Sequence, residues 1–205
     1  LLIEGGMDVN LKALIAKAVE RQPTGKTDKD ALVDEIASFV GDRLRRYFLD
    51  RDTGLATETF EAVMLRQPKS LLDFDRRLAA VQTFARMEQA QSLAAANKRT
   101  ANILRQAGDP EGLKINRKLL ADEAEQALFN ALENARDKVG PMIQQRQYAE
   151  ALSTLADLRD PVDRFFDDVM VMADDEAVKN NRLALLGELR ALFLDVADIS
   201  RLSLG

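Results

Sequence analysis

Apolar side chains recur at three- and four-residue spacing along nearly the whole chain, and this period is typical of amphipathic helices. Glycine and proline interrupt the pattern and leave short connections between its segments. A strand would need alternating apolar and polar positions, and no segment of the sequence shows that alternation. We therefore predict an all-α fold, an antiparallel helical bundle in which successive helices pack side by side.

The interruptions divide the chain into a series of predicted helices. We expect them near residues 8–20, 30–50, 57–67, 70–87, 88–108, 122–140, 147–159, 161–172 and 176–198. Asp8 is the expected N-cap of the first helix, and Pro23 and Gly25 indicate a linker after it. Pro141 is expected to open a new segment. The opening "LLIEGG" resembles a last helical turn closed by glycine, so we expect a piece of a longer protein.

Composition removes most catalytic chemistry. The chain of 205 residues is 46% apolar and 31% charged, as in a folded soluble domain, and it contains no cysteine and no histidine. Serine–histidine triads, cysteine–histidine pairs and histidine or thiolate zinc sites are therefore excluded. We expect a binding role without catalysis, and, since neither a signal peptide nor an apolar run of about 18 residues is present, a cytoplasmic protein with no membrane contact.

The stretch Ser92–Gly108 contains no acidic residue, although acids outnumber bases and the net charge is −5. Lys98, Asn102 and Arg105 align on the polar side of the predicted helix, with Arg99 beside them and small alanines around them. Cations and an amide on such an uncrowded face suit phosphates and base edges. The alternative is an ordinary solvated helix face, because alanine is also the best helix former.

Two arginines of the second helix occupy unusual positions. Leu32, Ile36, Phe39, Val40, Leu44 and Tyr47 share one side of that helix, Arg43 falls within this apolar stripe, and Arg46 lies at its flank. A guanidinium at a buried position needs a partner. Arg43 therefore either pairs internally with an aspartate or lies with Arg46 at a rim where a phosphate or base docks.

Arg182 lies on the apolar side of the last predicted helix, beside Asn181. An ion pair with one of the aspartates just before that helix would satisfy the guanidinium, and breaking a buried pair would be costly. Asn181 either caps the helix or contacts a ligand. Both residues are kept as candidate ligand contacts.

Acidic residues gather in "PVDRFFDDVMVMADD", where Asp163 and Asp167 could suggest a magnesium site or an acid–base pair. Val162, Phe165, Phe166, Val169 and Met172 share one face of the same predicted helix, and the acids flank that face. A core helix with a solvated border is the favoured interpretation. The alternative is an enzyme that uses these carboxylates to hold a metal ion.

Three phrases together resemble one known family. "LAAANKRTANIL", "PVDRFFDDVMVMADDEAVKNNRLALL" and "RALFLDVADISRL" are similar, in order and spacing, to the C-terminal region of the bacterial glycyl-tRNA synthetase beta subunit. The resemblance runs the full length of this chain. The family's beta subunit is several times longer and carries further domains ahead of this region.

The resemblance implies an all-helical, DALR-like anticodon-binding domain of the kind found in arginyl-tRNA synthetase. Residues 1–25 would then be the end of a preceding helical region and a linker, and residues 26–205 the domain itself. It implies tRNA(Gly) as a partner and an alpha subunit that uses ATP and magnesium to attach glycine, in a heterotetramer of two alpha and two beta chains. No cofactor is expected in this piece, whose part would be to hold the tRNA.

Anticodon binding is therefore the main hypothesis, with Lys98, Arg99, Asn102, Arg105, Arg43, Arg46, Asn181 and Arg182 as candidate contacts. Arginine suits guanine edges, phosphates and base faces, and asparagine both donates and accepts hydrogen bonds. The competing hypothesis is a helical interaction module that docks another subunit.

Overall fold

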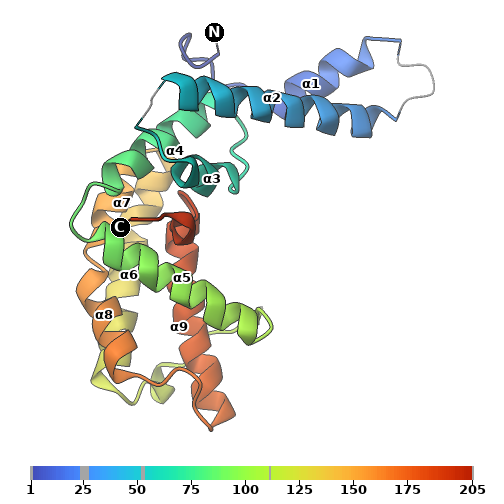
Figure 1. Cartoon of the computed structure of the whole chain (residues 1–205). Helices are drawn as coiled ribbons and strands as arrows, with labels where there is room; N and C mark the ends of the chain where they lie inside the picture. The colour runs from blue at the N-terminus through green and yellow to red at the C-terminus, as the bar shows by residue number, and fades with distance from the viewer. Residues whose placement is uncertain (1, 24–27, 52–53, 111, 205) are drawn as a thin grey trace.

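The computed structural model describes residues 2–23, 28–51, 54–110 and 112–204 (Figure 1). Within these ranges the regular structure is helical and no strand is present, which confirms the predicted all-α class. No helix in these ranges is long and apolar enough to cross a membrane. The elements are α1 Leu11–Glu20, α2 Lys29–Arg51, α3 Thr57–Met64, α4 Leu71–Phe84, α5 Ala90–Gln106, η1 Arg117–Leu119, α6 Glu123–Gln144, α7 Tyr148–Ala156, α8 Arg159–Asp168, α9 Glu176–Leu194 and η2 Ile199–Arg201.

The first two helices form a hairpin that projects from the rest of the molecule (Figure 1). Lys12 pairs with Asp34 across it at 2.8 Å. The C-terminal half of α2 returns to the body, where Phe48 packs on Phe60 of α3 and Phe74 of α4 with ring centroids 6.4 and 5.5 Å apart. The predicted linker at Gly25 and the boundary between residues 25 and 26 lie outside the described residues.

The residues before α1 form a turn with the hydrogen bonds of a helix C-terminus. Gly6 has a φ of +64° and its N–H donates to Ile3, while the N–H of Met7 donates to Leu2. This pairing is the Schellman motif, in which glycine takes the left-handed position. It agrees with the helix-end pattern expected from "LLIEGG".

Two predicted helix boundaries are wrong for local reasons. The N-cap of α1 is Asn10, whose side chain accepts from the N–H of Ala13 at 3.0 Å, and the carboxylate of Asp8 instead accepts from Ser70. Helix α6 continues through Pro141 to Gln144. A proline in the last turn removes only one hydrogen bond from the helix, so the apolar packing of α6 carries the helix past it.

The bundle core lies among α4 to α9, which pack as the short connections predicted (Figure 1). Helix α6 contacts α7, α8 and α9, while α5 lies against α8, α9 and η2. The fully buried large side chains include Phe84, Phe165 and Phe193 from three different helices. This arrangement fixes α5 beside the final turn of the chain.

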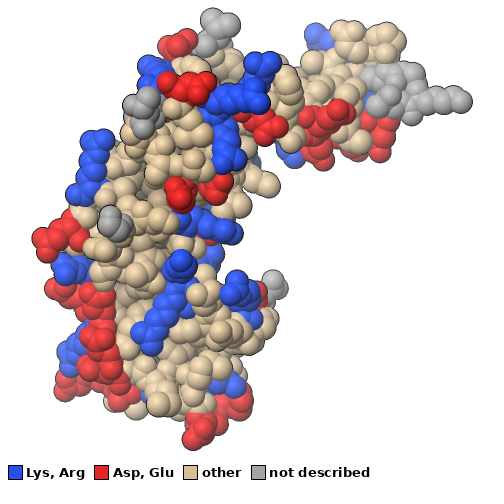
Figure 2. Space-filling view, viewed as in Figure 1, with Lys and Arg blue, Asp and Glu red and all other residues tan. Residues whose placement is uncertain are grey.

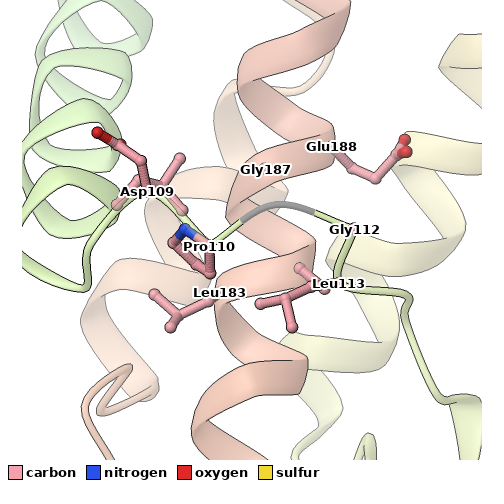
Figure 3. Close-up of a pocket in the computed structure, with 9 residues that line it drawn as sticks. Asp109, Pro110, Gly112, Leu113, Leu183, Gly187 and Glu188 are labelled. Atoms are coloured by element: carbon pink, nitrogen blue, oxygen red, sulfur yellow. The ribbon is translucent and has the colours of Figure 1, made fainter.

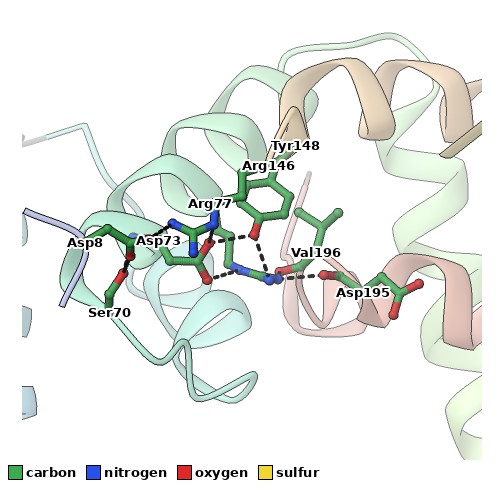
Figure 4. A network of polar contacts seen from close by, with 8 residues as sticks. All are labelled: Asp8, Ser70, Asp73, Arg77, Arg146, Tyr148, Asp195 and Val196. Atoms are coloured by element: carbon green, nitrogen blue, oxygen red, sulfur yellow. Dashed lines mark hydrogen bonds and ion pairs between the residues drawn. The ribbon is translucent and has the colours of Figure 1, made fainter. Parts of the chain in front are cut away.

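A polar network holds the end of α9 in place (Figure 4). The guanidinium of Arg77 donates to the carbonyls of Asp195 and Val196 at 2.6 and 2.7 Å, and to the carboxylate of Asp73 at 2.9 Å. A cation at the carbonyl end of a helix satisfies acceptors that the helix leaves unpaired. Arg77 thereby positions the residues that follow α9.

Tyr148 completes this network from α7. Its hydroxyl donates to Asp73 at 2.6 Å and accepts from Arg77 at 3.0 Å, and the guanidinium lies 4.3 Å from the ring centroid. Burial of the phenol and its hydrogen bond to Asp73 raise the pKa of Tyr148 to about 12. The hydroxyl is therefore a proton donor over the whole physiological pH range.

Candidate nucleic-acid interface

Helix α5 has a buried side and a cationic side. Leu93, Asn97 and Thr100 are almost fully buried, whereas Lys98 and Arg105 are exposed. The amide of Asn97 is satisfied within the helix by the carbonyl of Leu93 at 3.0 Å. The helix contains no acidic residue that could neutralise its cations. The face predicted from the sequence is thus present and open to solvent.

Lys98, Asn102 and Arg105 line one wall of an open groove of about 490 Å³. The other wall comes from the end of the chain, namely Arg190 of α9 and Asp198, Ser200 and Arg201 of the last turn. Arg105 donates to the side-chain oxygen of Asn102 at 3.0 Å, which orders both groups along the wall. Figure 2 shows Lys and Arg side chains gathered over α5 and this last turn, and acidic side chains gathered along α8.

The last turn reaches α5 because its apolar residues are buried. Val196, Ala197, Ile199 and Leu202 are at most 7% exposed, and the N–H of Asp198 donates to the carbonyl of Ala62 at 2.8 Å. Burial of this many apolar groups outweighs the entropy of ordering a chain end. The turn is therefore a fixed wall of the groove.

The groove is cationic although the chain is acidic. Four cations and two carboxylates line it, against a net charge of −5 for the whole chain. Asp198 pairs with Arg190 at 3.2 Å and also accepts from Ser200. The Nη1 of Arg190 is buried and makes no hydrogen bond within the described part of the chain. Buried polar atoms are normally paired, so this unpaired N–H is an exception at the groove wall.

Arg99 belongs to a different side of α5. Its guanidinium carbon lies 4.4 Å from the ring centroid of Phe166 in α8, a cation–π contact. Arg99 is exposed, and this contact directs it toward α8 and away from the groove. Lys98 and Arg99 are neighbours in sequence, and consecutive helical residues differ by about 100° in direction. The structure therefore brings three of the four α5 candidates into one groove.

Arg43 and Arg46 are both exposed on α2, and neither lines the groove. The expected internal pair of Arg43 with an aspartate is wrong. Its guanidinium carbon lies 5.3 Å above the ring of Phe39, which is itself 59% exposed. The buried side of α2 is formed by Gly41, Leu44 and Phe48 instead, so the apolar stripe is rotated away from Arg43.

Asn181 and Arg182 lie inside the domain. Asn181 is 3% exposed and accepts from the N–H of Asn116 at 2.6 Å. Arg182 is 9% exposed and donates to Glu125 at 2.6 Å, to Asp122 at 2.9 Å and to the carbonyl of Met170 at 2.8 Å. Because its nitrogens are engaged with partners inside the domain, Arg182 is a structural residue. Neither Asn181 nor Arg182 lines the groove.

The predicted ion pair of Arg182 exists, but its partners differ from those expected. They are the carboxylates at the start of α6, rather than the aspartates just before α9. One of those aspartates, Asp175, caps α9 and accepts from the N–H groups of Ala177 and Val178. Glu125 is fully buried and also accepts two backbone N–H groups at the start of α6, so the arginine joins the two helix N-termini.

Sequence reasoning missed Arg190, Ser200 and Arg201. These three residues lie in a mostly apolar segment. The spacing of apolar residues in that segment does not indicate which distant helix the last turn will contact. The usable signal was indirect, since "RALFLDVADISRL" is one of the three phrases that carry the family resemblance.

The acidic candidates do not form a metal site. Asp163 accepts from Ser92 at 2.5 Å and lies 3.7 Å from Arg159, and Asp167 is exposed. Among the described residues, no group of three or more acidic side chains is arranged to hold a metal ion. This geometry supports the interpretation of α8 as a core helix with a solvated border.

Comparison with known proteins agrees with the geometry. The DALR anticodon binding domain family matches residues 93–199, just over half of the chain and nearly all of the groove. The chain is 44% identical to the "Glycine--tRNA ligase beta subunit" of Chromohalobacter salexigens over 203 residues, and 45% identical to those of Marinobacter nauticus and Pseudomonas aeruginosa.

These alignments cover 98% of this chain and 29% of each relative, so the chain spans less than a third of their length. The resemblance stated from the three phrases is confirmed. The match includes the α5 wall of the cationic groove and Arg190 and Asp198 of the other wall, while Ser200 and Arg201 lie just beyond it. The chain belongs to the DALR anticodon-binding domain family.

Proposed function

We propose that this chain is the domain of a glycine--tRNA ligase beta subunit that binds the anticodon loop of tRNA(Gly). One observation carries the proposal, namely a cationic groove on an acidic chain, formed by α5 and the last turn and lying mostly within the matched family region. A net negative body repels nucleic acid in general, so binding is restricted to the surface where cations dominate.

The groove supplies both elements of single-strand recognition. Lys98 and Arg105 contact backbone phosphates, which set affinity and its salt dependence. Asn102 can donate to and accept from base edges, and Arg190 adds positive charge to the opposite wall. No proton transfer or bond formation is assigned to any of these residues.

The rest of the activity lies outside this chain in our proposal. An alpha subunit, in a heterotetramer of two alpha and two beta chains, uses ATP and magnesium to attach glycine to the tRNA in the cytoplasm. The name of the relatives supports a multisubunit ligase, because it designates them as beta subunits. This piece contributes tRNA binding only.

The test is the double substitution Lys98→Ala with Arg105→Ala in a filter-binding titration with tRNA(Gly). We expect weaker binding and a plot of log affinity against log salt that is flatter by about one to two counterions. The matched control, Arg86→Ala with Lys138→Ala, removes the same charge from exposed positions outside the groove. Equal slopes for the wild type and the groove variant would refute the placement.

A second candidate function is docking of another subunit, and the projecting α1–α2 hairpin favours it. Leu14 and Phe39 are 45% and 59% exposed there, an apolar surface on an element that only partly contacts the body. The chain would then bind the alpha subunit and produce no mobility shift with tRNA at low salt. A mobility shift at low salt together with no alpha-subunit binding would exclude this candidate.

A further inference from the structure

A pocket of about 290 Å³ lies next to the cationic groove, between the segment after α5 and the middle of α9 (Figure 3). Leu104, Pro110, Leu113 and Leu183 contribute apolar side chains to its lining, and Asp109 and Glu188 contribute carboxylates. Leu104 and Asp109 line both the pocket and the groove, so the two cavities share a border. A nucleotide whose phosphate lies on Lys98 or Arg105 is therefore beside a slot with leucine side chains in its walls.

Gly187 keeps this slot open. It occupies the interior of α9, where glycine costs about 1 kcal/mol relative to alanine. A Cβ atom at position 187 would meet nothing within 4 Å, so internal packing does not require glycine there. Gly41 shows the opposite case, because a Cβ atom there would lie 2.8 Å from Met64. The empty space next to Gly187 is the pocket itself, because Gly187 forms part of the pocket wall.

Two carboxylates, Asp109 and Glu188, lie at the rim of the pocket, and they favour ligands that donate hydrogen bonds. Glu188 is already paired with Arg136, whereas Asp109 is exposed and no partner of its carboxylate is found among the described residues. A carboxylate only accepts hydrogen bonds. Cytosine, adenine and guanine offer exocyclic amino groups to such an acceptor, while uracil presents two carbonyl oxygens beside its single N–H.

We propose that this pocket takes one unstacked nucleobase that bears an exocyclic amino group, with Asp109 accepting from that group and Leu104 and Leu183 covering the base. This inference rests on the proposed function and extends it. Phosphate contacts alone do not distinguish one RNA sequence from another, and Asp109 would be the residue that does. It also gives a role to Asp109, a carboxylate that lines both the cationic groove and the pocket.

The test uses the whole chain and two fluorescent single-stranded RNA probes, oligocytidylate and oligouridylate of equal length, measured by anisotropy at one salt concentration. We expect the wild type to bind oligocytidylate about fivefold more tightly or better. Asp109→Asn should abolish that preference, since asparagine offers an N–H₂ group to the uracil carbonyls. Asn also tolerates the left-handed backbone of position 109, where φ is +48°, so the variant keeps the loop conformation.

A second variant fills the slot. Gly187→Leu should reduce oligocytidylate affinity to that of oligouridylate, with the salt slope unchanged. Gly140→Leu is the matched control, because a Cβ atom at that α6 glycine also meets nothing within 4 Å and the residue lines none of these cavities. Its preference should remain that of the wild type.

The outcomes separate this inference from the function on which it rests. Salt-dependent binding of both probes with no base preference, or a preference that survives both Asp109→Asn and Gly187→Leu, would overturn the nucleobase pocket and leave RNA binding in place. Failure of the folded wild-type chain to bind either probe at low salt would overturn both proposals.

Discussion

The substitution Arg182→Met decides whether this residue supports the fold or contacts RNA. Arg182 is 9% exposed and its three donors reach Glu125, Asp122 and the carbonyl of Met170. Methionine keeps similar length and removes the charge. The variant leaves the fully buried carboxylate of Glu125 with only the N–H groups of Ala121 and Asp122 as partners.

Removing one member of a buried pair costs about 3–5 kcal/mol, because the remaining charge is uncompensated. That loss is a large part of the 5–15 kcal/mol that holds a typical domain together. At about 2–4 °C per kcal/mol for a domain of this size, the melting temperature should fall by roughly 10 °C. Combining Arg182→Met with Glu125→Gln should cost less than the sum of the two single changes, since the uncompensated charge is then absent.

The assay is thermal and urea unfolding followed by circular dichroism, with Arg164→Met as the control. Arg164 also joins α8 to a carboxylate of α6, at 2.9 Å from Glu123, but both side chains are mostly exposed. Exposed pairs contribute at most about 1 kcal/mol, so this control should unfold near the wild type. Equal, small effects of the two arginine variants, with tRNA affinity lost only in folded Arg182→Met, would refute the structural role.

Two further predictions concern stability. Because burial and the bond to Asp73 raise the pKa of Tyr148 to about 12 from an ordinary 10.0, the unfolded chain loses the phenol proton first, and wild-type stability should fall between pH 10 and 12. In parallel urea titrations, the free energy of unfolding of Tyr148→Phe should fall by up to about 2 kcal/mol less than that of the wild type over this pH range. Identical pH profiles of the two proteins would contradict a stabilising role for the Tyr148 hydroxyl. Asp175→Ala removes the N-cap of α9 and should cost about 1 kcal/mol in the same assay, whereas an unchanged midpoint would show that the cap is energetically neutral.

The periodicity of the sequence was sufficient to predict the helical class and the order of the helices. It was less able to predict which side of a helix is covered. In α2, Gly41 lies at the close approach to Met64, and a count of apolar residues treats glycine as neutral. The apolar stripe predicted from the sequence therefore includes Phe39, which is exposed, and leaves open whether Arg43 pairs internally or lies at a rim.

Only one wall of the groove could be predicted from the sequence. Lys98, Asn102 and Arg105 stand on one helix, so their shared direction follows from helical geometry alone. Arg190 and Arg201 reach the same groove through tertiary packing of the last turn, which local pattern does not encode. Arg182 shows the converse, since its place on the apolar side was evident, while its partners on α6 depended on how the two helix N-termini meet.

The most direct measurement of the central claim is a nuclease footprint of tRNA(Gly) with and without this chain. The account predicts protection confined to the anticodon loop, and loss of that protection in the Lys98→Ala, Arg105→Ala variant but not in the Arg86→Ala, Lys138→Ala control. An unprotected anticodon loop, under conditions where the folded chain is in excess, would contradict the assignment of the α5 groove to RNA.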